Sequence, residues 1–353
     1  MLTSVCISGT SSIRDAVICI DRNGHGIALI TNPEGQLLGT ITDGDIRRAM
    51  LAGIDFDLPI SVLLAQKASS PCSVPVIAHV GTSLDTLLQL MQKHSVRQIP
   101  LVDEYERVAD LVTIEELIPQ TELPVQAVVT AGGRGTRLRP LTEELPKSML
   151  PVGGRPLMER IIEQLKLAGI RRVNVTTHYK AEKIIEHFGD GHAFGVELHY
   201  VNEDQPLGTG GGLGLLPVPH QPLLVINGDI LTQVDFRAML AFHQEQLAEM
   251  TIAVCRYDMQ VPFGVVECDG PFVRQLKEKP QMGVLVNAGI YLLEPSVYDL
   301  IPNGTNFDMT DLIQWLLEKG RAVVSFPIFE YWLDIGQHGD YVRAQHDVKK
   351  GRM

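Results

Sequence analysis

Apolar and polar positions along residues 125–353 predict short strands separated by amphipathic helices. Apolar runs of about four to eight residues with polar or glycine boundaries are typical of buried strands, and apolar residues three and four positions apart indicate helices. The expected strands are 127–130, 172–177, 196–201, 222–227, 285–293, 322–326 and 331–336, the expected helices are 156–168, 181–188, 309–319 and a final one, and 263–268 with 272–276 forms a hairpin. This alternation predicts an α/β domain with a doubly wound sheet.

Residues 1–120 show one pattern twice, in the order helix, strand, polar turn, strand, helix. The expected elements are 12–21, 26–31, 37–42 and a helix from Asp43 in the first copy, and 84–93, 98–102, 108–113 and 114–117 in the second. The repetition predicts two small α+β modules, about 1–62 and 68–120. A short polar, proline-containing stretch, 121–125, is expected to link them to the second domain at 125–353.

The composition is that of a folded protein, with 353 residues of which 45% are hydrophobic and 20% charged. Thirty basic and 42 acidic side chains give a net charge of −12, which argues against a general nucleic-acid binder. No signal peptide or membrane span is evident, so a cytoplasmic protein without membrane contact is expected. The cysteines form no CxxC pair and are expected to be reduced and mostly buried: Cys6, Cys19, Cys72, Cys255 and Cys268.

The stretch 127–151, AVVTAGGRGTRLRPLTEELPKSMLP, combines an expected strand with a loop rich in glycine and positive charge. The loop holds three glycines and four cations: Gly132, Gly133, Gly135, Arg134, Arg137, Arg139 and Lys147. Glycines after a strand allow several backbone N–H groups to face one ligand, and cations beside them suit a polyphosphate. Neither the P-loop pattern nor the dinucleotide fingerprint is present.

The ordered residues GGxGTRL, PLT and PK of this loop resemble the signature of the sugar nucleotidyltransferases. Five more segments follow in the order of that family: EDQPLGTGG (203–211), NGD (227–229), EKP (278–280), NAGIY (287–291) and WLDIG (332–336). The resemblance covers most of residues 125–353. It implies a Rossmann-like, GT-A-type domain with a mixed sheet, which joins a sugar 1-phosphate to a nucleoside triphosphate and releases pyrophosphate.

Position in these motifs implies roles for individual residues. The expected catalytic residues are Arg137 on the β- and γ-phosphates, Lys147 on the α-phosphate and sugar phosphate, and Asp229. Asp229 and Asp334 are expected to bind Mg²⁺, which prefers hard carboxylate oxygens; for either one alone, the alternative is a helix cap. The expected nucleotide contacts are Ala131, Gly132, Gly133, Gly135, Thr136, Glu203 and Gly208, and the expected sugar-phosphate contacts are Glu278, Lys279 and Asn287. The alternative for Glu278 and Lys279 is a solvated ion pair.

Glu203 is expected to select the base, because its position reads the base edge in the family that the chain resembles. Guanine offers two adjacent donors, N1–H and the 2-amino group, that one carboxylate can accept together. Uracil and thymine offer a single N–H beside carbonyl groups that would repel a carboxylate. The residue therefore favours GTP as the nucleotide.

The duplicated modules resemble a tandem pair of CBS domains, most clearly at LGTITDGDIRR (38–48). The resemblance implies an adenine nucleotide bound in a cleft of the pair, with Asp45 on the ribose hydroxyls and Thr42 on the phosphate. The alternative is that Asp43 and Asp45 only cap a helix. In the second module the matching positions are Thr113 and Glu116, which departs from the family pattern.

A CBS pair ahead of this transferase domain resembles the glucosamine-1-phosphate guanylyltransferases of legionaminic acid pathways. The expected reaction is GTP with glucosamine 1-phosphate to GDP-glucosamine, with Mg²⁺. The same motifs serve mannose 1-phosphate and heptose 1-phosphate enzymes, which stay as alternatives, together with an adenine-nucleotide sensor that lacks catalysis. The CBS pair is expected to tune the transferase and to join chains into a homo-oligomer.

Overall fold

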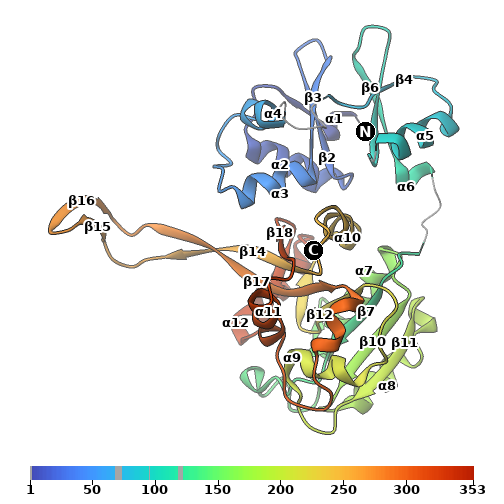
Figure 1. The fold of residues 1–353 in the computed structure, drawn as a ribbon, viewed down its shortest axis with the longest axis vertical. Helices are drawn as coiled ribbons and strands as arrows, with labels where there is room; N and C mark the ends of the chain where they lie inside the picture. Colours follow the sequence, from blue (N-terminus) through green and yellow to red (C-terminus); the bar gives the residue numbers. More distant parts are fainter. Residues whose placement is uncertain (1, 68–73, 95, 118–121) are drawn as a thin grey trace. The chain divides into compact units, whose positions relative to one another are not determined.

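The computed structural model of the chain describes residues 2–67, 74–94, 96–117 and 122–353. It divides into two compact units, 1–121 and 122–353 (Figure 1). Cys72 lies outside the described residues. Of the other four cysteines, all with free thiols, Cys19 and Cys255 are buried and Cys268 is exposed.

The first unit holds two similar three-stranded sheets, as the repeated pattern predicts. The first module comprises α1 (Leu2–Val5), β1 (Cys6–Ser8), α2 (Ile13–Asn23), β2 (Ile27–Thr31), β3 (Leu37–Thr42), α3 (Asp43–Leu51) and α4 (Ser61–Lys67). The second comprises β4 (Ala78–His79), α5 (Leu84–His94), β5 (Gln98–Val102), β6 (Val108–Thr113) and α6 (Ile114–Leu117). The sheet orders are β1-β2-β3 and β4-β5-β6, with the last pair antiparallel in each.

The two modules pack against each other through backbone and apolar contacts. Val108 N donates to Gly35 O at 3.0 Å, and Gln98 Nε2 donates to His25 O at 2.9 Å. One apolar cluster takes residues from both modules: Val5, Ile27, Leu29 and Leu111. Each hairpin also carries a register shift next to its turn, which supports the duplication.

The second unit is built on a seven-stranded sheet of order β11-β10-β7-β12-β17-β14-β18. Its strands are β7 (Gln126–Thr130), β10 (Arg172–Thr177), β11 (Glu197–Asn202), β12 (Leu223–Asn227), β14 (Met250–Gln260), β17 (Gln281–Leu293) and β18 (Val323–Ile328). Only β17 runs antiparallel to its neighbours, β12 and β14. The mixed sheet expected from the sequence is therefore confirmed.

Helices cover both faces of this sheet, and each face has its own core (Figure 1). The helices are α7 (Leu157–Leu167), α8 (Ala181–Phe188), α9 (Gly208–Gly211), α10 (Phe236–Glu245), α11 (Met309–Glu318) and α12 (His338–Lys349), and the short turns are η1 (Thr136–Leu138), η2 (Lys147–Met149), η3 (His192–Phe194), η4 (Gly212–Leu215) and η5 (Pro295–Leu300). Neighbouring residues of β7 face opposite ways: Val129 packs with α7 and α8, and Val128 packs with α11. Strands buried on both faces read as continuous apolar runs.

Short strand pairs complete the unit: β8 (Pro151–Val152) with β9 (Arg155–Pro156), β13 (Ile230–Thr232) with β19 (Trp332–Asp334), and β15 (Val265–Asp269) with β16 (Phe272–Lys277). The last pair is the expected hairpin. No element is predicted from the sequence for residues 236–260, which hold α10 and β14, and β17 begins four residues before its predicted start. The outer halves of β14 and β17 continue as a two-stranded ribbon tipped by β15 and β16, here called the arm (residues 256–285; Figure 1).

Buried His243 of α10 makes the stability of the second unit depend on pH. Only 1% of its side chain is exposed; Nδ1 lies 2.7 Å from Thr251 Oγ1, and Nε2 lies 3.1 Å from Glu294 Oε1. Burial lowers the pKa of His243, and Glu294 only partly opposes this. The unfolded chain therefore binds a proton near the ordinary histidine pKa while the folded chain does not. The contribution of neutral, buried His243 to the free energy of unfolding is therefore present above the ordinary histidine pKa and is lost as pH falls below it.

We predict that lowering the pH from 8 to 5.5 destabilises the wild type more than His243→Gln, by up to about 1.4 kcal/mol per pH unit. Urea unfolding can be followed by tryptophan fluorescence, because the two tryptophans, Trp315 and Trp332, both lie in the second unit. The exposed His199→Gln is the matched control. Equal losses in the wild type and His243→Gln would contradict the prediction.

Candidate active site

The site is assembled where two neighbouring parallel strands, β7 and β12, end. Thr130 is the last residue of β7 and pairs with Asn227, the last of β12. Thr130 Oγ1 donates to Asn227 Oδ1 at 3.3 Å, and Gly228 N donates to Thr130 O at 2.9 Å. A Cβ on Gly228 would lie 2.8 Å from that oxygen, so this close approach of the strand ends requires glycine. Ligands of open α/β sheets bind at this carboxyl edge.

Asp229 and Asp334 are brought together by the pairing of β13 with β19. Ile230, directly after Asp229, lies opposite Asp334, and Ile335 N donates to Asp229 O at 3.1 Å. The two aspartates lie 105 positions apart in the sequence. The antiparallel pairing of β13 and β19 therefore unites the NGD and WLDIG motifs in one site.

Lys147 of η2 stands between these two carboxylates. Its Nζ forms an ion pair with Asp229 and lies 3.8 Å from Asp334 Oδ1. Burial raises the pKa of Asp334, the negative charge of Asp229 raises it further, and Lys147 opposes the rise. Two carboxylates next to one ammonium group leave an excess of negative charge that suits a cation.

The fit of a divalent metal follows from these oxygens. No group of three or more His, Cys, Asp or Glu side chains with metal-binding geometry occurs in the described residues. Mg²⁺ is commonly held by one or two carboxylates, with water and substrate phosphates as its other ligands. Asp229 and Asp334 fit that kind of site and would be the residues that hold the ion.

The glycine-rich loop folds tightly onto the segment that carries Lys147. Gly135 has a φ of 58°, and a Cβ there would lie 2.9 Å from Thr142 Cγ2 and 3.2 Å from Lys147 Cβ. Thr142 Oγ1 donates to Gly135 O at 2.8 Å, which closes the loop. Gly132, Gly133 and Thr136 lie in the same turn, and Ala131 N donates to Thr176 O at 2.9 Å.

Arg137 lies on η1 of this loop and lines a cavity of about 370 Å³ together with Gln337, His338 and Gly339. His338 Nε2 lies 2.8 Å from the backbone oxygen of Arg139, which joins the start of α12 to the loop. Arg137 is also near enough to Asp334 to lower the pKa of that carboxyl slightly against the larger effects of burial and Asp229. The structure thus brings four predicted residues together: Arg137, Lys147, Asp229 and Asp334.

A second cavity, of about 180 Å³, opens beside Asp334 and contains the predicted Asn287. Its lining residues are Asn227, Ile230, Asn287, Ala288, Gly289, Tyr291, Trp332 and Asp334. The Asn287 amide is held at both ends, because Nδ2 donates to Tyr291 Oη at 2.9 Å and Oδ1 accepts from Gly289 N at 2.9 Å. Three lining residues had no predicted role although they stand inside the motifs NGD, NAGIY and WLDIG: Asn227, Tyr291 and Trp332.

Glu203 lies beneath the glycine-rich loop with 5% of its surface exposed. Its Oε2 accepts from Leu207 N at 3.0 Å, and both carboxylate oxygens lie 3.4 Å from the place of a Cβ on Gly132. Gly208 follows at the start of α9, where its backbone packs against Phe307 and Asp308. The base-reading role of Glu203 stays a prediction.

Glu278 and Lys279 are not brought to either cavity. Both are exposed and lie on the arm, in the turn between β16 and β17. Asn287 is eight positions further along, and the extended strand from Gln281 to Asn287 alone spans about 20 Å. Their contact with the sugar phosphate therefore stays a prediction, because this arrangement does not bring the two residues to either cavity within one chain.

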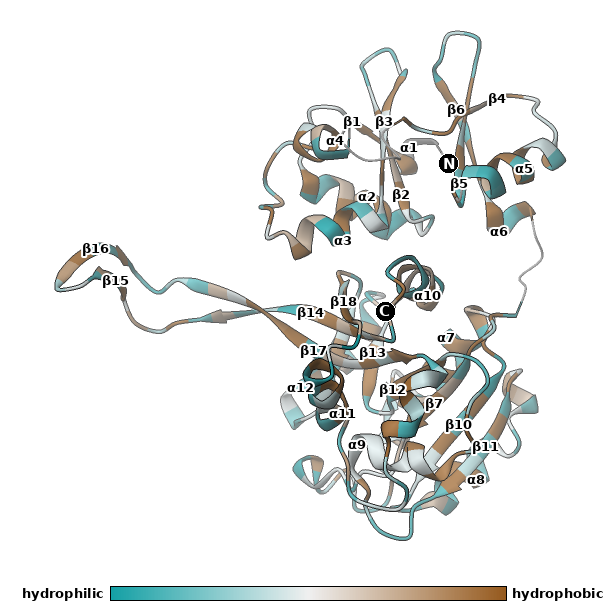
Figure 2. Ribbon diagram, viewed as in Figure 1, coloured by the Kyte–Doolittle hydropathy of each residue, from teal (hydrophilic) through white to brown (hydrophobic). Residues whose placement is uncertain are grey.

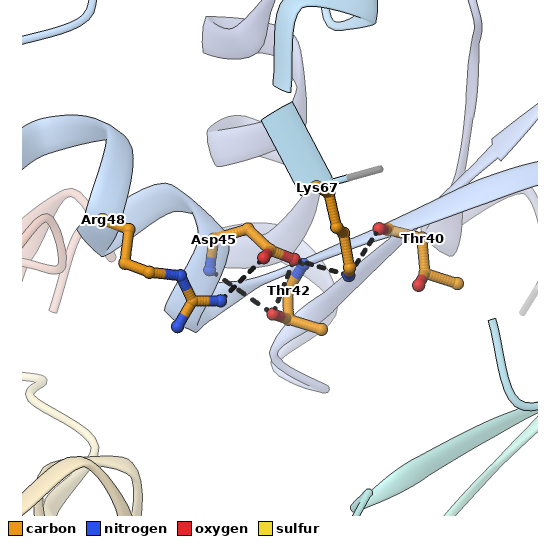
Figure 3. A network of polar contacts seen from close by, with 5 residues as sticks. All are labelled: Thr40, Thr42, Asp45, Arg48 and Lys67. Carbon is orange, nitrogen blue, oxygen red and sulfur yellow. Dashed lines mark hydrogen bonds and ion pairs between the residues drawn. The ribbon is translucent and has the colours of Figure 1, made fainter. Parts of the chain in front are cut away.

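Asp45, in the first unit, is enclosed by hydrogen bonds and cations (Figure 3). Oδ2 accepts from Thr42 N and Oγ1, both at 2.9 Å, and from Lys67 Nζ at 2.8 Å, while Oδ1 accepts from Arg48 at 2.8 Å. Burial raises the pKa of Asp45, but Lys67 and the hydrogen-bond donors together lower it by more. The pKa of Asp45 therefore lies below its ordinary value. Thr42 and Asp45 form a capping box on α3, so the helix-cap role considered for Asp45 is present.

In the second module, Thr113 N donates to Glu116 Oε2 at 3.0 Å, which repeats the backbone half of that capping box. Glu116 is exposed. Among the described helices, none is long and apolar enough to cross a membrane.

Comparisons with known proteins agree with both units. The nucleotidyl transferase family model matches residues 126–351, and the CBS domain model matches 1–52 and 71–119. A mannose-1-phosphate guanylyltransferase of Mycobacterium tuberculosis is 36% identical over 236 residues, covering 64% of this chain and 65% of that protein. A UTP–glucose-1-phosphate uridylyltransferase of Synechocystis is 32% identical over 245 residues, covering 64% and 63%. The chain thus spans just under two thirds of the length of these relatives.

Two solved structures of HddC from Yersinia pseudotuberculosis are also similar. The one complexed with GMP-PN is 25% identical with a TM-score of 0.50, and the other is 26% identical with a TM-score of 0.51. Each match covers 63% of this chain and 99% of that one. With the motifs, the sheet and the family model in agreement over residues 126–351, the chain belongs to the nucleotidyl transferase family and carries a CBS pair ahead of that domain.

Proposed function

We propose that this protein joins a sugar 1-phosphate to a nucleoside triphosphate and releases pyrophosphate. The observation that carries the proposal is the cluster of Lys147, Asp229 and Asp334, of which Asp334 lines the cavity that contains Asn287 and lies near Arg137 of the other cavity. Two phosphate-bearing substrates need two adjoining binding places and positive charge between them. The names of the relatives support the same reaction class.

The residues divide the work of an in-line displacement. A phosphate oxygen of the sugar 1-phosphate attacks the α-phosphorus, and pyrophosphate leaves on the opposite side. Lys147 supplies positive charge where the two phosphates meet, and the Arg137 guanidinium fits two oxygens of the leaving pyrophosphate. When bound at Asp229 and Asp334, Mg²⁺ supplies further neutralisation of phosphate charge.

The proposed substrates are GTP and, first, glucosamine 1-phosphate, with mannose 1-phosphate and heptose 1-phosphate as alternatives. Guanine is proposed because Glu203 lies beneath the glycine-rich loop. Oε2 accepts from Leu207 N at 3.0 Å, so Oε1, which lies against Gly132 and Gly212, is the oxygen left to accept from the base. Names of relatives include guanylyl and uridylyl enzymes. Pyrophosphate release should be assayed over GTP, UTP, CTP, ATP and dTTP with these sugar phosphates and glucose 1-phosphate. No release with any pair would overturn the proposal.

We predict that Asp229→Asn lowers turnover at least about 100-fold while the protein stays folded. The change removes one carboxylate from the proposed metal site, and it also removes the nearer of the two carboxylates that pair with Lys147. The control is Asp299→Asn, an exposed aspartate on η5. Circular dichroism checks folding, and binding of Mn²⁺ measured by electron paramagnetic resonance checks the metal site independently of turnover. Turnover within a few-fold of the wild type would remove Asp229 from the mechanism.

We predict that Glu203→Gln narrows the preference for GTP over UTP by about 10-fold in kcat/KM. The amide oxygen can keep the bond from Leu207 N, so the amide NH₂ then replaces the oxygen that guanine needs as an acceptor. Glu197→Gln, which changes an exposed residue of β11, is the control. An unchanged GTP:UTP ratio would show that Glu203 supports the loop without reading the base.

We also propose that the CBS pair binds an adenine nucleotide near Thr42 and Asp45 and tunes the transferase. Lys67 already occupies Asp45 Oδ2, so a ribose hydroxyl has to displace that lysine. Lys67→Gln leaves the capping box intact and should strengthen AMP binding, whereas Asp45→Ala removes the helix cap as well. Calorimetry of the full chain with AMP and ADP, and turnover with and without them, test this. Coupling of about 1–3 kcal/mol is the most to expect, and no binding at millimolar concentration would end the proposal.

A further inference from the structure

The arm has an apolar face that nothing in the described part of the chain covers. Along the ladder Tyr257 lies opposite Val284, and Met259 lies opposite Met282. Alternate residues of a strand share a face, so these four side chains lie together on one side of the ribbon. They are 44–56% exposed. The tip also exposes large apolar side chains, those of Val266, Phe272, Val273 and Leu276, and Figure 2 shows brown segments on β15 and β16.

One edge of β17 is open over the same stretch. Residues 281–287 pair with β14 on one side, while β12 pairs only with Ile290–Leu293 on the other. No other strand of the described chain pairs with that outer half of β17. An open edge of this length is a template for another strand, and an isolated two-stranded ribbon is only marginally stable in water.

We propose that a second copy of this chain pairs with the arm along the open edge of β17, with the two β17 strands side by side and antiparallel, so that each arm reaches the partner's active site. A two-fold axis at Gly283 pairs position 279 of one chain with position 287 of the other, because each position lies four residues from 283. That register places Lys279 of one chain beside the Asn287 cavity of the other. Gly283 has no side chain at the axis, where two backbones approach most closely.

The cavity that contains Asn287 has no cation in its own lining, and Lys147, which lies 3.8 Å from Asp334 Oδ1, is the cation beside it. The lining itself supplies amide, aromatic and carboxylate groups. The EKP motif carries a further cation, and in its own chain it lies beyond the far end of the extended strand from Gln281 to Asn287. This step rests on the proposed function, since it assumes that a phosphate enters the cavity.

Folding back within one chain is the competing arrangement. For Lys279 to reach its own Asn287, the ladder from Arg256↔Leu285 to Gln260↔Gln281 would have to open. Pairing between two copies keeps that ladder, adds backbone hydrogen bonds along the open edge and places the apolar faces of the two arms next to each other on one side of a wider sheet. The second copy is therefore the occupant that the geometry favours.

The first test is independent of activity. In a Cys268→Ser background, which removes the exposed thiol of the arm, Gly283→Cys should form a disulfide-linked dimer on mild oxidation. Only the flexible side chains of Arg256 and Asp258 have to shift for the new Cβ. Val342→Cys on the exposed surface of α12 is the matched control. A monomer by light scattering, or no more cross-linking than the control, would overturn the proposal.

The second test uses complementation. Lys279→Ala and Asp229→Asn chains, each inactive alone, are co-expressed with different tags and the mixed dimer is isolated. One of the two sites in the mixed dimer then combines the intact Asp229 of one chain with the intact Lys279 of the other, so about half the wild-type activity should return. If Lys279 serves its own chain, no activity returns. The cross-link reports the arm pairing even if the proposed reaction is wrong, so the two failures are distinguishable.

Discussion

Two carboxylates that share one lysine are the interaction on which the second unit depends. Asp229 and Asp334 carry like charges in a partly buried place, and Lys147 offsets their repulsion by pairing with both. Three separate pieces of backbone deliver these groups: the end of β12, the end of β19 and the turn η2. The pairing of β13 with β19 and the tight glycine turn at Gly135 are the geometric conditions for that meeting.

The same strand that lines the sugar-side cavity also forms the arm. β17 is buried from Ala288 onwards and exposed before it, so one continuous strand crosses from the core to solvent at Asn287. Asn287 is fixed by Tyr291 Oη and Gly289 N, both on the buried side of that boundary. The buried part of β17 thus fixes Asn287 in the cavity, and a partner that contacts the arm approaches the cavity from the solvent side.

Local pattern predicted most of the fold, because buried strands and helix faces leave a strong periodic signal. Strand β10 and helix α8 have the bounds expected from the sequence. Only part of one failure has a physical reason. The outer part of β14 alternates charged residues, such as Arg256 and Asp258, with apolar ones on a ribbon that leaves the sheet, so it lacks a continuous apolar run. The inner part, 250–255, has such a run and was missed all the same. α10 was missed although Asp235 accepts from the N–H groups of Arg237 and Ala238, as an N-cap does.

The site was predicted through ordered motifs, and the parts that escaped prediction depend on long-range contacts. No local sequence feature predicts that Lys67, 22 positions away, contacts Asp45, or that Gly132 lies against Glu203. Position in a motif assigned Asp45 to a ligand, whereas the folded chain uses the same oxygens for a helix cap and for two cations. A carboxylate in that state can take a new partner only by releasing an old one, and Lys67, which is not part of the capping box, is the partner that can leave while the cap on α3 is kept.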